Sequence, residues 1–236
     1  MTRPLRVLCL HGYTQNGQTF RDRMGPFRRS LKRTLDPVFI TAPHEATEFQ
    51  PESKEASESR AWWNRSGDVW AETAQSVRFI HRVMRDAGPF DGIVGFSQGS
   101  GMAAILMALM QAAHTQKPQN THWDADHWDA DLRELIQELA DCPLPKFAML
   151  FAGFYPELPQ FDVLVREPKG CKINVPTLHM VGQTDAIVPM ERGQLLATQA
   201  FVDAQLRTHE SGHFVPGNAA WRKQYQEFID GLDLQR

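Results

Sequence analysis

The sequence predicts an α/β fold, in which a mostly parallel sheet carries helices on both faces. Two observations carry this prediction: short apolar runs of strand length alternate with amphipathic helical patterns along the chain, and the runs are almost continuously apolar, as in strands buried on both faces. The chain has 236 residues, 42% of them hydrophobic, with no change of composition along its length. We therefore expect one domain spanning 1–236.

In the first third of the chain, an apolar run at Leu5–Leu10 predicts a buried strand that ends at His11-Gly12. Apolar residues then recur every three or four positions, which predicts one helix with an inner face of Phe20, Met24, Phe27, Leu31 and Leu35. A second short strand follows at 38–40. The polar stretch 44–60 is expected to be a mobile loop, either a solvated insertion or part of a flap at 44–70 over the site.

The rest of the chain continues the alternation. Helices are expected around 73–84, from Gln98 to about Ala113, around 191–200 and near the C-terminus, where Trp221, Tyr225, Phe228 and Leu232 form the inner face. A short buried strand is expected in the stretch that begins at Phe90 and runs into Gly95-Phe96-Ser97. Further strands are expected at 147–153, 175–182 and 204–209, with a proline-rich loop reaching to about residue 174. The segment 114–143 is an insertion that a minimal fold does not need.

Composition narrows the possible partners. The net charge of −3 and the lack of a long basic run give no sign of nucleic-acid or anionic-membrane binding. No apolar run is long enough to span a membrane. The three cysteines, Cys9, Cys142 and Cys171, are widely spaced, which favours free thiols in a reducing compartment. We expect a cytoplasmic protein, with the nucleus as the alternative location. The sequence does not determine the oligomeric state.

A tandem duplication, His122-Trp123-Asp124-Ala125-Asp126 followed by His127-Trp128-Asp129-Ala130-Asp131, lies inside the insertion. Its histidines and aspartates could bind a metal ion. A polar loop that leads into a surface helix is the favoured interpretation, because Leu132, Leu135, Ile136 and Leu139 follow at helical spacing. We expect neither a metal nor a cofactor.

Ser97 is the candidate nucleophile. It lies in Gly95-Phe96-Ser97-Gln98-Gly99, between a predicted strand and a predicted helix. A serine at such a reversal has a strained backbone, and flanking glycines let strand and helix pass closely. The turn exposes the hydroxyl at the sheet edge, beside the N-terminus of the helix.

A serine hydroxyl needs a histidine to take its proton and an acid to orient that histidine. His213 follows the last predicted strand and is favoured as the base, with His209 as its nearest rival. His179 is interpreted as structural. Asp185 directly follows the strand 175–182 and is the candidate acid. The order nucleophile, acid, base is that of α/β-hydrolases.

Two further groups of residues complete the predicted site. The backbone N–H groups of Tyr13 and Gln98 are expected to form the oxyanion hole, since one follows an early strand and the other follows the nucleophile. Trp62, Trp63 and Phe154 are candidate contacts for the substrate, because their aromatic rings suit an apolar acyl group.

Several motifs together resemble the serine hydrolase family called FSH, whose members include a fungal thioesterase that releases a polyketide. They are Leu10-His11-Gly12-Tyr13-Thr14-Gln15-Asn16, Gly88-Pro89-Phe90-Asp91-Gly92, Gly95-Phe96-Ser97-Gln98-Gly99, Gly182-Gln183-Thr184-Asp185 with Val188-Pro189, and Gly212-His213-Phe214-Val215-Pro216. The resemblance runs in the same order from about Leu5 to Phe228, and the pair Trp62-Trp63 also fits it.

The resemblance implies an α/β-hydrolase fold that needs no cofactor and acts on a small-molecule ester or thioester, with Ser97, Asp185 and His213 matching the family's triad. An acyl-protein thioesterase-like enzyme and a short-chain carboxylesterase are the alternatives within this class. A binding protein that keeps the fold without turnover is a further hypothesis.

Overall fold

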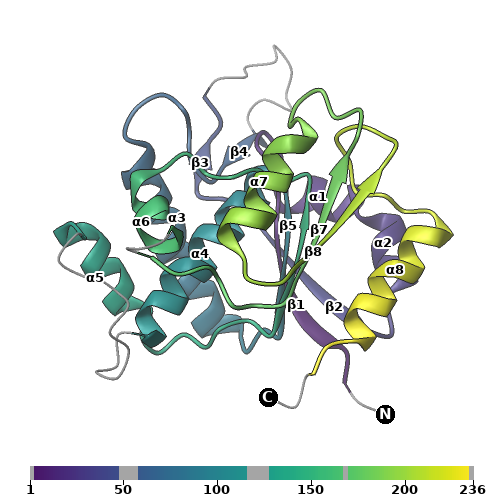
Figure 1. Ribbon diagram of the computed structural model, residues 1–236, viewed down its shortest axis with the longest axis horizontal. Coiled ribbons are helices and arrows are strands. Elements are labelled where there is room, and N and C mark those ends of the chain that lie inside the picture. Colours follow the sequence, from purple (N-terminus) through teal and green to yellow (C-terminus); the bar gives the residue numbers. More distant parts are fainter. Residues whose placement is uncertain (1–2, 48–57, 116–127, 167–169, 234–236) are drawn as a thin grey trace.

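The central sheet consists of six parallel strands in the order β2-β1-β5-β6-β7-β8 (Figure 1). The computed structural model describes residues 3–47, 58–115, 128–166 and 170–233. The strands are β1 (Leu5–Leu10), β2 (Leu35–Ile40), β5 (Gly92–Phe96), β6 (Phe147–Phe151), β7 (Thr177–Gly182) and β8 (Ala204–His209). A separate antiparallel ribbon pairs β3 (His44–Glu45) with β4 (Arg60–Ala61). The predicted parallel sheet is confirmed.

Helices cover both faces of this sheet, also as predicted. One face carries α1 (Gly17–Arg23), α2 (Gly25–Ser30) and α8 (Ala219–Asp230) (Figure 1). The other carries α3 (Val69–Ala87), α4 (Gln98–Thr115), α6 (Pro159–Val165) and α7 (Met190–Ala200), with α5 (Ala130–Glu138) packed against α4. Side chains of β1 alternate between the two cores, since Val7 and Cys9 face one and Leu8 and Leu10 the other.

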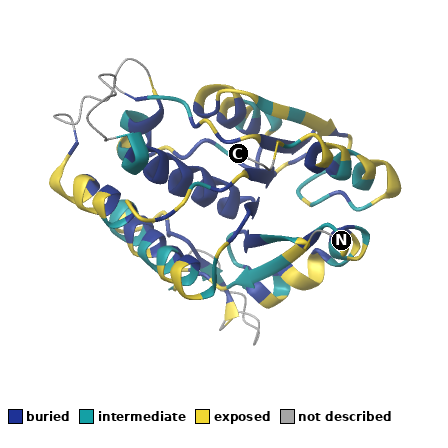
Figure 2. Cartoon of the chain, turned by 90° about the horizontal axis from the view of Figure 1, so that it is seen from below, coloured by how far each residue is buried: buried dark blue, intermediate teal, exposed yellow. Residues whose placement is uncertain are grey.

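Helix α4 lies at the centre of the larger core. Every residue from Gln98 to Ala112 is buried, which Figure 2 shows as a dark blue helix enclosed by its neighbours. A helix that is apolar on all sides requires such enclosure. The sheet, α3, α5 and α6 provide it. The N-terminus of α4, directly after Ser97, is therefore held rigidly at the carboxyl edge of the sheet.

The prediction of one long helix after β1 was wrong, because the structure has two short helices that meet at Met24. Pro26 stands in the first turn of α2, where its missing N–H is harmless, whereas inside a continuous helix its ring would clash with the preceding turn. Leu35 belongs to β2 rather than to a helix. Pro37 is accommodated in β2 because β2 is an edge strand.

Two other loop predictions need correction. The proline-rich connection after β6 contains α6, which begins at Pro159 and buries Phe161, Leu164 and Val165. The polar stretch after β2 is tied at both ends, because β3 pairs with β4. The predicted flap at 44–70 includes residues 48–57, which lie outside the described residues.

The insertion at 114–143 is described from residue 128 onward. Most of the duplication, residues 122–127, lies outside the described residues. Its end starts the predicted surface helix, since the Asp129 side chain accepts a hydrogen bond from Leu132 N (2.7 Å) and caps α5. Within the described residues, no helix combines the length and apolar character needed to cross a bilayer.

Candidate active site

Ser97 lies in a sharp turn between β5 and α4 with a left-handed backbone (φ 52°). Its N–H donates to the carbonyl oxygen of Phe151 on the neighbouring strand (2.8 Å). A Cβ at Gly99 would lie 2.1 Å from the carbonyl oxygen of Leu10, so only glycine fits there. A strained serine held in this way at a strand-to-helix turn is typical of a nucleophile.

Asp185 and His213 are brought together at the carboxyl edge of the sheet. His213 Nδ1 donates to Asp185 Oδ2 at 2.7 Å, because a carboxylate can only accept. The other carboxylate oxygen of Asp185, Oδ1, accepts from the N–H groups of Ile187 (2.9 Å) and Val188 (2.8 Å). Asp185 is thereby fixed, and the second ring nitrogen of His213, Nε2, is left for chemistry.

The ring of His213 packs against Phe96, with the two ring centroids 4.9 Å apart. Phe96 directly precedes Ser97, so this contact holds the imidazole beside the turn that carries the serine. The His213 side chain keeps 14% of its surface exposed, whereas that of Asp185 is fully buried. An imidazole that a buried carboxylate orients and solvent still reaches suits proton transfer.

The loop after β1 passes close to the serine. A Cβ at Gly12 would lie 3.2 Å from Ser97 Cβ, which shows how nearly the two backbones meet. The loop is closed by a hydrogen bond from Gly12 N to Gln15 Oε1 (3.2 Å) and by Thr14, which has a left-handed backbone (φ 63°). The hydroxyl of Tyr13 donates to Asn64 Oδ1 (3.2 Å).

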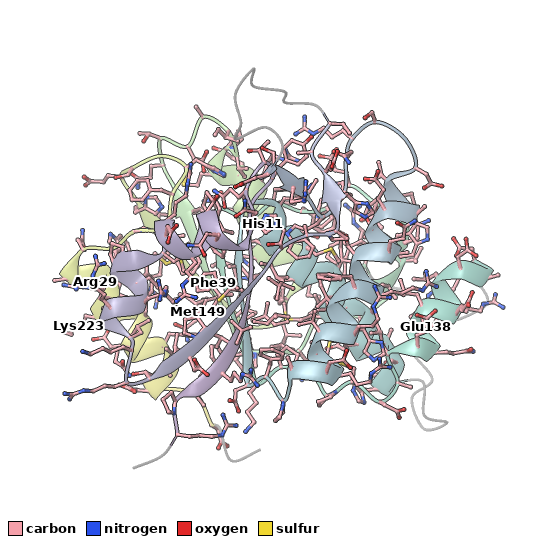
Figure 3. The ribbon with its side chains drawn as sticks, turned by 180° about the vertical axis from the view of Figure 1, so that it is seen from behind. His11, Arg29, Phe39, Glu138, Met149 and Lys223 are labelled. Carbon is pink, nitrogen blue, oxygen red and sulfur yellow. The ribbon has the colours of Figure 1, made fainter. Side chains whose placement is uncertain are left out.

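His11 shapes this loop from beneath, and Figure 3 places it toward the upper edge of the sheet. Its Nδ1 donates to Gly12 O (2.7 Å) and its Nε2 accepts from Ala42 N (2.9 Å), so the ring is neutral. Burial lowers the pKa of His11 to about 4. His11 therefore supports the loop instead of serving as a base.

The side chain of Gln98 makes a clamp that the sequence did not suggest. Its Oε1 accepts from Trp62 N (2.9 Å) and its Nε2 donates to Trp63 O (2.6 Å). Gln98 is also the first residue of α4, so its own N–H has no carbonyl within the helix to bind. One residue thus presents a backbone donor beside Ser97 and fixes the neighbouring tryptophan segment.

A pocket of about 630 Å³ opens beside the serine. Predicted residues in its wall are Ser97, Gln98, Tyr13, Trp63 and Phe154. The remaining wall residues, which the sequence did not indicate as part of a site, are Arg65, Val69, Pro156, Glu157, Leu158, Ile187, Val188 and Arg192. Trp63 and Phe154 meet edge to face, with their centroids 6.2 Å apart.

Trp62 does not line this pocket, so its prediction as a direct substrate contact is wrong. Its side chain is completely buried, and its indole N–H donates to His11 O (2.8 Å). The adjacent indoles point to different places, one into the core and one into the pocket wall. Two neighbouring tryptophans in a sequence cannot by themselves reveal this division.

Two further histidines, His179 and His209, are buried. His179 is buried within β7 as predicted, and burial lowers its pKa to about 3. His209, the rival base, is also buried, and burial lowers its pKa against the opposing effect of Asp185. Across residues 3–47, 58–115, 128–166 and 170–233, no three His, Cys, Asp or Glu side chains gather in a metal-binding cluster.

Comparisons with known proteins show the family and the fold of this chain. A family model described as serine hydrolase (FSH1) matches residues 1–225. Esterase OVCA2 of Danio rerio is 33% identical, over 96% of each chain. The crystal structure of Arabidopsis thaliana SOBER1 superposes with a TM-score of 0.61 at 15% identity, covering 96% of this chain and 98% of that one. Zea mays acyl-protein thioesterase 2 gives a TM-score of 0.59 at 17% identity, covering 97% and 95%.

The six-stranded parallel sheet, the strand-to-helix turn at Ser97 and these structural likenesses define an α/β-hydrolase fold. The resemblance noted in the sequence is confirmed by the family match over residues 1–225 and by the similarity of this chain to Esterase OVCA2. The chain belongs to the FSH family of serine hydrolases.

Proposed function

We propose that this protein is a cytoplasmic serine esterase or thioesterase that forms an acyl-enzyme on Ser97, with Asp185 and His213 completing a catalytic triad. The observation that carries the proposal is the 2.7 Å hydrogen bond from His213 to a buried Asp185, next to a serine with a strained backbone. Ser97, Asp185 and His213 follow β5, β7 and β8, whose carboxyl ends lie at one edge of the parallel sheet, and this arrangement supports the proposal.

In this proposal His213 Nε2 removes the proton from Ser97 Oγ as the oxygen attacks the carbonyl carbon of the substrate. The N–H groups of Tyr13 and Gln98 stabilise the oxyanion that forms. As the bond to the leaving group breaks, His213 gives the proton to the departing oxygen or sulfur. Water, activated by the same histidine, then hydrolyses the acyl-enzyme and regenerates the serine.

The pocket beside Ser97 supports an apolar acyl group. At about 30 Å³ for each water-sized group, its volume of about 630 Å³ holds roughly twenty such groups. Much of the wall is apolar, including Trp63, Phe154, Leu158 and Ile187. This volume favours a medium or long acyl chain and makes a short-chain carboxylesterase the weaker alternative.

The first experiment is the initial rate on p-nitrophenyl esters of increasing acyl length, with Ser97→Ala in parallel. Ser100→Ala is the matched control, since Ser100 is the next serine along the chain and its hydroxyl already donates to Phe151 O (3.0 Å). We expect Ser97→Ala to lose activity by about a thousandfold or more, whereas Ser100→Ala stays within about threefold of wild type.

A burst of p-nitrophenolate in wild type would reveal the accumulating acyl-enzyme. Equal rates in wild type and Ser97→Ala would refute the role of Ser97. If all three proteins were inert across the series while remaining folded, the proposed esterase activity would be rejected in favour of a binding protein.

A further inference from the structure

A second, smaller hollow is lined in part by His213, the proposed catalytic base. Its volume is about 180 Å³, and its wall is formed by Gln15, Phe20, Arg23, Met24, Phe96, His213, Phe214 and Val215. The larger pocket includes Ser97 and Gln98 but not His213, whereas the smaller one includes His213 but not Ser97. The two hollows therefore meet different members of the proposed triad.

This division matters because the two halves of an ester have different requirements. The carbonyl oxygen must point toward the N–H groups of Tyr13 and Gln98, which lie with Ser97 in the larger pocket. When the carbonyl–oxygen bond to the alcohol breaks, the departing oxygen takes the proton that His213 received from Ser97 Oγ. The alcohol must then lie within reach of His213 Nε2.

We propose that the smaller hollow is the pocket for the leaving alcohol, and that it selects compact, apolar alcohols. This inference rests on the proposed function, in which Ser97 carries the acyl group. At about 30 Å³ for each water-sized group, a volume of about 180 Å³ holds roughly six non-hydrogen atoms. The natural substrate is then an ester with a large acyl part and a small alcohol.

The wall of this leaving-group pocket is apolar and firmly supported. Phe20 and Met24 are almost completely buried, and the Phe96 ring packs on Phe20 with their centroids 6.0 Å apart. The Phe96 ring also packs against His213 and lies close to the backbone of Gly12, where an added Cβ would be 3.0 Å from Phe96 Cδ1. These contacts leave the ring little room to move away from the hollow. A rigid apolar wall discriminates by size.

Polar side chains in the wall are few. Arg23 is exposed to solvent, and Gln15 already accepts a hydrogen bond from Gly12 N. Most of the wall is apolar, so the hydroxyl groups of a sugar or glycerol would find fewer partners there than in water, which disfavours such alcohols. By the same reasoning the pocket favours simple alkyl esters over thioesters of a long thiol that carries amide groups.

The test uses hexanoate esters of methanol, propanol, butanol, hexanol and octanol, so that the acyl group stays constant. The value of kcat/KM covers the steps through acylation, in which the alcohol leaves. In wild type we expect kcat/KM to rise with alcohol size up to about six non-hydrogen atoms and to fall beyond that size.

Val215→Leu is the decisive variant because it adds a methylene group to the wall of the smaller pocket. We expect kcat/KM to fall at least tenfold for the butyl ester and less than twofold for the methyl ester. The methyl ester serves as the internal control, because any general damage to His213 would lower its kcat/KM as well. Ile187→Ala is the matched control in the larger pocket. It should alter the acyl-length preference and leave the order of alcohols unchanged.

An independent readout is the partitioning of the acyl-enzyme between water and an added alcohol, measured as ester formed against acid released. By microscopic reversibility the attacking alcohol occupies the site of the leaving one. Butanol should capture the acyl group better than octanol, and Val215→Leu should remove this difference.

The inference is overturned if Val215→Leu lowers kcat/KM equally for all the esters, or if Ile187→Ala changes the order of alcohols instead. It is likewise overturned if octyl esters react as well as butyl esters. A wild-type rate in Ser97→Ala would instead overturn the proposed function itself, so the two failures are distinguishable.

Discussion

The amide of Gln98 binds the backbone of two adjacent tryptophans, so Gln98→Met removes two buried hydrogen bonds while roughly keeping the side-chain volume. Trp62 N and Trp63 O would both lose their partner on Gln98. A buried backbone group left unsatisfied costs about 1–3 kcal/mol, so the free energy of unfolding should fall by about 2–6 kcal/mol. Trp63 should also shift, because its backbone is no longer held.

The chain provides a matched control on the same helix. Gln111 is buried in α4 and binds backbone in the same way, since its Nε2 donates to Lys172 O (2.9 Å) and its Oε1 accepts from Asn174 N (2.6 Å). Gln111→Met should therefore lose a similar free energy of unfolding. It lies outside the wall of the pocket beside Ser97, so its activity should not change.

The assay compares urea unfolding with kcat/KM for a medium-chain p-nitrophenyl ester in the two variants. We expect similar losses of stability, with a fall in kcat/KM of about tenfold or more in Gln98→Met alone, since displacements of about 1 Å at a catalytic site can lower rates by about a hundredfold. If both variants had the same activity, Gln98 would stabilise the fold without positioning the site.

Two further predictions concern charge. In Asp185→Asn, the oxygen of the new side chain should keep its hydrogen bonds from the N–H groups of Ile187 and Val188. Its NH₂ group then faces His213 Nδ1 and forces the imidazole proton onto Nε2. The value of kcat should fall about 10⁴-fold with little change in KM, and a residual kcat above one tenth of wild type would contradict this. Burial lowers the pKa of His179 to about 3 from an ordinary 6.5, so between these values the unfolded state binds more protons and stability is lost as pH falls. His179→Leu should therefore reduce the difference in unfolding free energy between about pH 6.5 and about pH 5 by about 2 kcal/mol, measured by urea unfolding at both pH values, and an unchanged difference would refute this cause.

The central features of the fold could be predicted from local sequence. Continuous apolar runs marked β1, β5, β6 and β7, because strands buried on both faces have no polar side to show. The glycines around Ser97 marked the turn after β5, because only they allow such close backbone contact. These signals are strong since each depends on a few adjacent residues.

The helix predictions were wrong at two places where the same local sequence was compatible with two different structures. Apolar spacing continued through Met24, but Pro26 required a new helix to begin there. The prolines between β6 and β7 suggested a loop, yet Pro159 stands at the start of a helix, the position at which proline favours helix formation. In both places proline marked a helix start instead of a helix end.

The walls of the two pockets could not be predicted, because they combine residues far apart in the chain. Arg65 and Arg192 both line the larger pocket, and Gln15 and Val215 both line the smaller one. The double use of the Gln98 amide was equally hidden, since its partners are backbone groups about 36 positions away. Such contacts depend on how the elements pack, which no short motif records.

The ribbon of β3 and β4 has a consequence for how this protein can diversify. Arg60 in β4 also binds the loop after β1, since its carbonyl oxygen accepts from Thr14 N (3.0 Å) and its N–H donates to Gln15 O (3.0 Å). Ala46 N also donates to Ser59 O (3.1 Å), and Thr47 N donates to Asn64 Oδ1 (3.0 Å), so the stretch between Thr47 and Glu58 leaves from and returns to fixed anchor points. Closing the same gap with a longer chain costs only about 0.6 kcal/mol for each doubling of length. Evolution can therefore rewrite the length and composition of this stretch without disturbing Gly12 and Tyr13, and an engineer can graft a peptide at the same point.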